Sequence, residues 1–158
     1  MRRGGSPGLP RWLVRIGWIL GSVWTAPNTA LGLLLGGFGM LAGARVALSS
    51  SELAVVFAQW PWGQGGALTL GNCILHTGRS LDTSCALYAP VAGCPAELVP
   101  RLADHERAHV FQYMVLGPLF LPVYLVCGGI SARNPFERAA DRYALTGRGW
   151  WPSLKVRS

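Results

Sequence analysis

The stretch "LADHERAHVFQYMVLGPLFLPVYL", residues 102–125, decides how this chain is interpreted. The chain has three histidines, and two of them, His105 and His109, stand four positions apart near its start. On a helix this spacing places both imidazoles on one face, where they can occupy neighbouring corners of a zinc tetrahedron. Glu106 lies beside that face and can take a proton from a water that the metal activates. The stretch therefore predicts a zinc site next to a very apolar segment.

A second stretch, "NPFERAADRYA", supplies a third ligand. It predicts a helix that is capped by Asn134 and has Pro135 at its first position. Two histidines leave a catalytic zinc site one protein ligand short, and Glu137 is the carboxylate that we expect to complete it. Asp141, one turn further on, is suited to accept a hydrogen bond from the far nitrogen of a ligand imidazole.

These two motifs resemble a known family. HExxH followed by ExxxD is the pattern of the gluzincin class of zinc metallopeptidases, and "ERAADRYA" looks like the corresponding helix of the membrane-bound M48-type peptidases. "HERAHVFQ" is also similar to the HExxHxxQ of metallopeptidase-like domains in contractile injection systems. The resemblance covers about residues 102–145. It implies one Zn2+ per chain held by His105, His109 and Glu137, with Glu106 as base and Asp141 supporting the ligands.

The composition indicates membrane association. Only 13% of the 158 residues are charged and 51% are apolar, which is too little charge for an ordinary soluble domain. A net charge of +7 together with seven tryptophans favours anionic lipid headgroups. Nucleic acid is not an expected partner, because the arginines are scattered and Lys155 is the one lysine. The expected partners are membrane lipid and a peptide or protein substrate.

The N-terminal part predicts the membrane segment. Residues 1–15 form a basic flexible tail, expected on the cytoplasmic side, and residues 16–45 an apolar membrane-associated helix or hairpin. The uncharged run of 29 residues from 16 to 44 exceeds the roughly 20 that cross a bilayer, but Pro27 should end or kink a helix there. One broken span and two short helices both fit. Residues 2–26 also fit a signal peptide loosely.

Four glycines in this segment, Gly32, Gly36, Gly39 and Gly43, form two pairs at four-residue spacing. Small residues at this spacing allow close approach between helices in lipid. They equally allow a helix to pack tightly against the rest of its own domain. The sequence leaves both roles open.

Residues 46–148 predict an α+β fold, a minimal zincin-like domain. "ELAVVFAQW" from residue 52 and "ALTLGNCILHTG" at 67–78 predict two antiparallel strands, with a third near 84–93. We expect this short antiparallel sheet to pack on the HExxH and ExxxD helices. The uncharged run at 114–130 contains Pro118 and Pro122, which favours a buried or re-entrant connection over one straight span. Residues 149–158 form an aromatic and basic tail, either an interfacial anchor or a solvated end.

Further residues are candidates for contacts with substrate. His76 lies on a predicted strand, and in zincins a strand edge lines the substrate cleft. A tyrosine can donate a hydrogen bond to the oxyanion of peptide hydrolysis, and the candidates are Tyr113, Tyr124 and Tyr143. Of the four cysteines, Cys85 and Cys94 are close enough in sequence to bridge a loop, and their oxidation state stays open.

The sequence thus predicts a membrane-associated, zinc-dependent metallopeptidase that hydrolyses peptide bonds with a zinc-activated water. The alternative is a non-catalytic membrane protein with a structural or vestigial zinc site. The fourth coordination position separates them, because a catalytic site leaves it open and a structural site closes it with a protein group.

Overall fold

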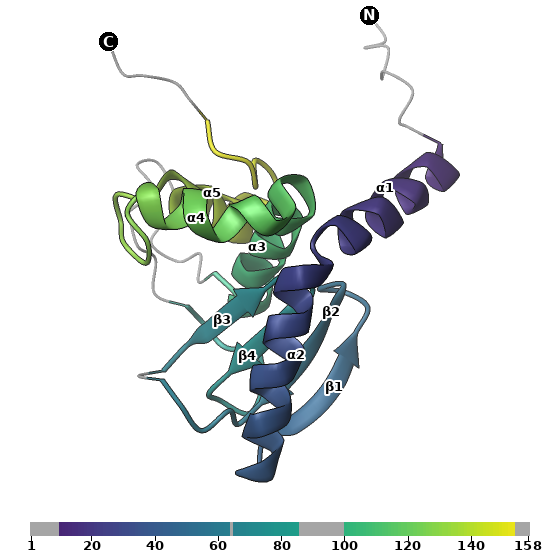
Figure 1. Cartoon of the computed structure of the whole chain (residues 1–158). Helices are drawn as coiled ribbons and strands as arrows, with labels where there is room; N and C mark the ends of the chain where they lie inside the picture. The colour runs from purple at the N-terminus through teal and green to yellow at the C-terminus, as the bar shows by residue number, and fades with distance from the viewer. Residues whose placement is uncertain (1–9, 64, 86–99, 154–158) are drawn as a thin grey trace, which may run out of the picture.

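The computed structural model of the chain describes residues 10–63, 65–85 and 100–153 (Figure 1). This part of the chain has an α+β fold, as expected. Its elements, in chain order, are α1 (Arg11–Trp24), α2 (Ala26–Leu41), β1 (Arg45–Ser49), β2 (Ala54–Ala58), β3 (Ala67–Leu70), β4 (Cys73–His76), α3 (Leu102–Leu116), the 3-10 helix η1 (Gly117–Leu119), α4 (Phe120–Val126) and α5 (Pro135–Thr146).

The sheet is mixed, which corrects the prediction of an antiparallel one. Its strand order is β1-β2-β4-β3, and the neighbours β2 and β4 run parallel. The run at 67–78, predicted as one strand, folds back at Gly71 and Asn72 into the β3–β4 hairpin. Gly71 has a φ of 62°, a left-handed conformation that glycine adopts at little cost. The hairpin leaves β3 at the edge of the sheet.

Two further differences concern the strands. β1 was not predicted, and it pairs antiparallel with β2. The strand expected near 84–93 falls largely outside the described residues. At its start, Ser84 forms an isolated antiparallel bridge with Arg101, directly before α3.

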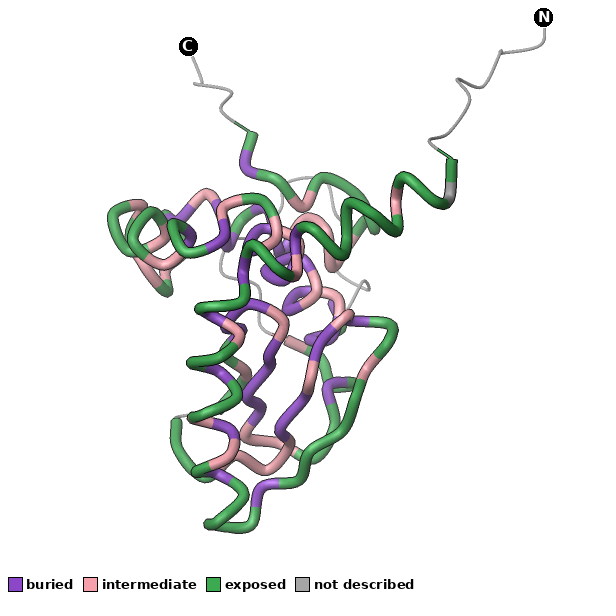
Figure 2. Tube along the Cα trace, turned by 45° about the vertical axis from the view of Figure 1, so that its right-hand side comes forward, coloured by how far each residue is buried: buried purple, intermediate pink, exposed green. Residues whose placement is uncertain are grey.

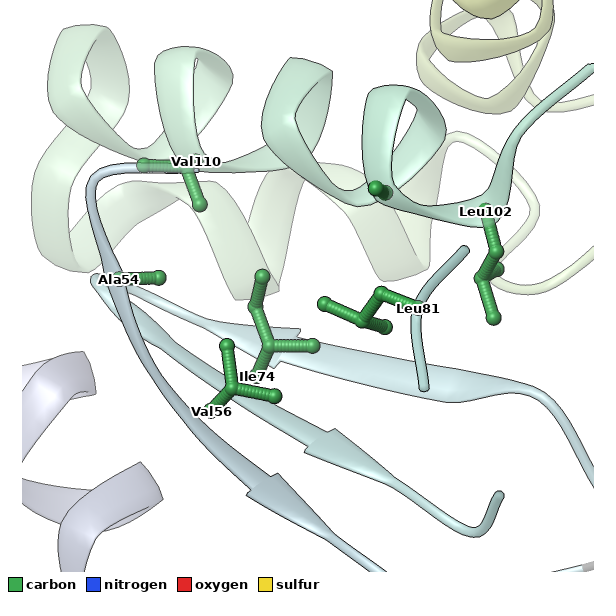
Figure 3. Packing of buried hydrophobic residues seen from close by; sticks show 7 residues of the cluster. Ala54, Val56, Ile74, Leu81, Leu102 and Val110 are labelled. Atoms are coloured by element: carbon green, nitrogen blue, oxygen red, sulfur yellow. The ribbon is translucent and has the colours of Figure 1, made fainter. Parts of the chain in front are cut away.

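Helix α3 packs on one face of the sheet. Ala54, Val56 and Ile74 point toward it from β2 and β4, and Val110 points back from the helix (Figure 3). Ile74 and Val110 have no exposed surface, so this layer is a closely packed core. The alternation of strand residues sends Phe57 to the opposite side.

Helix α2 covers that opposite face through its glycines. A Cβ at Gly32 would lie 2.6 Å from Cys73 Cβ, and one at Gly36 would lie 2.3 Å from the Phe57 ring. A Cβ at Gly39 would meet the ring of Trp60. Of the two roles left open by the sequence, the structure gives Gly32, Gly36 and Gly39 the second, close packing against their own sheet.

The break in the N-terminal apolar segment lies where proline predicts it. α1 and α2 meet at Thr25 with a bend of 66°, and Pro27 is in the first turn of α2. Asn28, buried at this bend, donates a hydrogen bond to the carbonyl of Gly117 at 2.8 Å. The bend is therefore anchored to the start of η1.

The outer faces of α1 and α2 are apolar and exposed (Figure 2). By length and composition alone, the bent pair is long and apolar enough for one broken membrane span or a re-entrant loop, and the stretch Leu102–Val126 is long and apolar enough for a single span. The stretch Leu102–Val126 is divided by η1, which contains Pro118. Its first part is α3, the helix that packs on the sheet. The exposed large apolar residues of α1 and α2 are Trp12, Leu13, Ile16, Trp18, Ile19, Leu20, Val23, Trp24, Leu31, Leu33, Leu34, Phe38, Met40 and Leu41.

The end of the described chain folds back onto the helices. The Trp150 ring lies 5.6 Å from that of Phe111, and the Trp151 ring lies 6.1 Å from that of Phe136, measured between centroids. Arg142 donates hydrogen bonds to the carbonyls of Gly149 and Trp151. The rings of Trp150 and Trp151 therefore pack against aromatic side chains of α3 and α5.

The contact between α2 and the sheet can be tested with neighbouring glycines. Gly36→Ala should destabilise the fold by about 1–3 kcal/mol, because the new methyl group collides with the Phe57 ring. Gly37→Ala is the matched control: nothing lies within 4 Å of its Cβ position, and alanine favours the helix by up to about 1 kcal/mol. Thermal unfolding in detergent measures both. Equal midpoints for the two variants would contradict this packing.

Candidate metal centre

Three side chains from two helices converge on one buried point. α3 contributes His105 and His109, and α5 contributes Glu137. The exposed fractions of these residues are 4%, 7% and 3%. Nε2 of His105 lies 3.2 Å from Nε2 of His109 and 3.1 Å from Oε2 of Glu137, and the His109 Nε2 lies 3.4 Å from the same oxygen. The three residues predicted as ligands are thus brought together.

The triangle of donor atoms has the size that a zinc ion requires. Bonds of 2.0–2.1 Å in tetrahedral geometry place neighbouring ligand atoms about 3.3 Å apart. The observed edges of 3.1, 3.2 and 3.4 Å match this spacing. Two imidazoles and one carboxylate are also a common ligand set of catalytic zinc. The group therefore fits a metal ion, and two nitrogens with one oxygen favour a transition metal over calcium or magnesium.

Each of the three side chains is held by a further polar partner. Nδ1 of His105 lies 3.2 Å from Oδ1 of Asp141, which has no exposed surface. This is the contact predicted for Asp141. Tyr124 of α4 donates its hydroxyl proton to Oε1 of Glu137. Nδ1 of His109 lies 2.8 Å from Oε1 of Gln112, which follows it by one turn in α3. Such outer partners fix ring orientation and increase the affinity of ligands for metal.

The electrostatics of the site favour positive charge. Burial lowers the pKa of His105, but the hydrogen bonds to Asp141 and Glu137 outweigh it and raise that pKa to about 10. Burial raises the pKa of Glu137, but opposing contacts, of which the hydrogen bond with His105 is the largest, hold that pKa well below its usual range. Carboxylates that stabilise an imidazolium in this way also stabilise a cation bound at the same point.

A cavity of about 190 Å³ opens beside the three ligands. Glu106 lines it and is 4% exposed, and Thr69 on the edge strand β3 donates a hydrogen bond of 2.6 Å to its Oε2. The remaining lining is mostly apolar and comes from β3, α4 and the loop after α4. The lining residues are Ala67, Leu68, Thr69, His105, Glu106, His109, Tyr113, Phe120, Leu121, Tyr124, Leu125, Ile130 and Glu137.

The three candidate tyrosines take different positions. Tyr113 lines the cavity, and its hydroxyl has no hydrogen-bond partner among the described residues. Burial and the nearby Glu106 charge raise its pKa, so the hydroxyl keeps its proton. The hydroxyl of Tyr124 is bonded to Glu137. Tyr143 packs against Phe111 outside the cavity lining.

His76 is buried on β4, one strand inward from the edge strand that lines the cavity. Burial lowers its pKa, and the charge of Glu106 opposes this shift. Its predicted contact with substrate stays a prediction. Cys85 is a free thiol, and Cys94, its possible disulfide partner, lies outside the described residues.

Sequence reasoning missed two parts of the site. No local pattern marks Thr69, because its bond to Glu106 joins residues 37 positions apart. The bond between His109 and Gln112 could have been found, because three-residue spacing on a helix brings the two side chains together. The sequence motif HExxHxxQ contained that signal.

Comparisons with known proteins add no further assignment. The chain matches no family model, no curated protein and no solved structure. The feature of the chain that indicates a function is the buried group of two histidines and one glutamate, whose arrangement is consistent with an HExxH-type site.

Proposed function

We propose that this protein is a membrane-associated, zinc-dependent peptidase. The observation that carries the proposal is that three side chains of a kind that can bind a metal line the wall of a cavity that Glu106 also lines. Structural zinc sites have four protein ligands, whereas catalytic sites have three and an open position. Within the described ranges, the group that could hold a metal has three members, and neither His76 nor a cysteine belongs to it. This supports a catalytic site over the alternative, a structural one.

Glu106 is the proposed general base. Zinc, when bound, would polarise a substrate carbonyl and acidify a water molecule. The hydrogen bond from Thr69 holds the Glu106 carboxylate at the cavity wall, beside the ligand His105. From there Glu106 takes the proton of the attacking water and passes it to the leaving amine. The substrate is a peptide or protein.

Tyr113 is the proposed donor to the oxyanion. Tyr113 is one of the residues that line the cavity, and its buried hydroxyl has no partner among the described residues and stays protonated. A positioned hydroxyl donor stabilises the negative charge that develops on the carbonyl oxygen during attack. Tyr124 is less suited to this role, since its proton is already donated to Glu137, and we assign it to orienting that ligand.

The role of Glu106 is tested by removing its charge without changing its shape. Glu106→Gln should keep zinc and reduce hydrolysis of a random library of internally quenched peptides by about 10²–10⁴-fold, because an amide cannot accept the proton. Glu52→Gln is the control, since Glu52 is also buried but bonds to Ser49 and Ser51 instead.

Hydrolysis by Glu106→Gln at the wild-type rate would contradict the assigned role. A wild-type protein that binds zinc and cleaves none of the peptides would favour the structural alternative. The two results are distinguishable because zinc content is measured on the same samples.

We propose that the exposed apolar faces of α1 and α2 contact lipid. Ile19 and Leu20 are 63% and 64% exposed, and they belong to a helix with many similarly exposed neighbours. Exposed apolar surface of this extent is typical of a membrane or protein contact. The basic residues Arg2, Arg3 and Arg11 precede the apolar part, which favours a cytoplasmic N-terminus.

Charges placed on α1 test this contact. In cells, Ile19→Asp with Leu20→Asp should move the protein from the carbonate-washed membrane pellet to the soluble fraction. Each aspartate costs about 2.5–3.5 kcal/mol at the centre of an apolar span. Leu48→Asp is the control, because Leu48 is 86% exposed but lies on β1. An unchanged pellet fraction for the double variant would argue against lipid contact through α1.

A further inference from the structure

Gln112 stands at the junction of three parts of the structure. It lies in α3, has no exposed surface, and makes three hydrogen bonds through its side-chain amide. Oε1 lies 2.8 Å from Nδ1 of His109. Nε2 donates to the carbonyls of Phe136, at 3.1 Å, and Trp150, at 2.8 Å. These carbonyls belong to the first turn of α5 and to the segment after α5.

The two carbonyls determine which way the amide faces. A carbonyl only accepts hydrogen bonds, so both must meet the NH2 group of Gln112. The amide oxygen must then face His109, and an oxygen there requires a proton on Nδ1 of the imidazole. The lone pair of a neutral His109 ring is consequently on Nε2. That nitrogen is the one that lies 3.2 Å from the corresponding atom of His105.

The same bonds connect the ligand to the end of the described chain. Trp150 is held by Gln112 and by ring packing on Phe111, and its neighbours Gly149 and Trp151 are held by Arg142. Gln112 is the member of this contact network that also reaches a metal ligand. Its amide therefore couples the orientation of His109 to the packing of residues 149–151.

We infer that Gln112 is a positioning residue that sets His109 in the Nδ1–H tautomer, with Nε2 ready to bind the metal. The part of this inference that concerns metal binding rests on the proposed zinc site. The tautomer itself is a property of the chain and can be measured without zinc. The inference has two separable halves, because Oε1 acts on His109 and the NH2 group acts on the backbone carbonyls.

Two substitutions that keep the size of the side chain separate the bond to His109 from the bonds to the backbone carbonyls. Gln112→Met removes both, while Gln112→Glu keeps an oxygen that accepts from Nδ1 and loses the amide protons. Arg142→Met is the structural control, since it releases Gly149 and Trp151 without touching His109. The readouts are the nitrogen NMR shifts of the His109 ring, zinc affinity by competition with a chelator, and the thermal unfolding midpoint.

The expected results differ between the readouts. All three variants should lower the unfolding midpoint. Gln112→Met should weaken zinc binding by about 10–100-fold, the usual effect of losing such a partner, and should lose the slowly exchanging Nδ1 proton of His109. Gln112→Glu and Arg142→Met should keep that proton and bind zinc within a few-fold of wild type.

Two results would overturn the inference. One is a wild-type His109 whose proton resides on Nε2 in the metal-free protein. The other is a loss of zinc affinity in Arg142→Met or Gln112→Glu as large as in Gln112→Met, which would reduce Gln112 to a structural role. If wild type binds no zinc but carries the proton on Nδ1, the proposed function fails and the tautomer assignment stands.

Discussion

Nε2 of His105, Nε2 of His109 and Oε2 of Glu137 lie within 3.4 Å of one another in a site with very little exposure to solvent. Burying polar and charged groups this closely is costly unless each has a partner. The structure supplies those partners from α3, α4 and α5, through Gln112, Tyr124 and Asp141. The relative positions of these helices are therefore constrained by the site as much as by apolar packing.

Apolar packing on both faces of the sheet supports this arrangement of helices. α3 lies between the sheet and α5, so its helix faces serve two purposes: Val110 packs into the core while His105 and His109 turn toward Glu137. α2 covers the far side of the sheet at a distance that glycine permits, and the bend at Thr25 ties α1 and α2 to η1. The exposed apolar surface outside these layers belongs largely to α1, α2 and α4, the helices that would face lipid in a membrane-associated protein.

The sequence predicted which of these side chains share a helix face, because that information is local. Four-residue spacing fixes two side chains on one helix face, and this holds for His105 with His109 and for Glu137 with Asp141. The sheet could not be predicted in the same way. Gly71 and Asn72 interrupt a run that alternates like one strand, and the parallel pairing of β2 with β4 depends on where that turn falls. The bond from Thr69 to Glu106 likewise depends on tertiary structure, since no local spacing links those residues.

The central claim is that His105, His109 and Glu137 bind one zinc ion at a site open for chemistry. Elemental analysis of protein purified in detergent without chelators tests it most directly, on wild type, His105→Ala, Glu137→Ala and Glu106→Gln. We expect close to one zinc per chain in wild type and Glu106→Gln, and its loss in the other two variants. A wild-type protein that contains no zinc, and takes up none when zinc is added, would contradict the account and leave HERAH as an ordinary polar face of a helix.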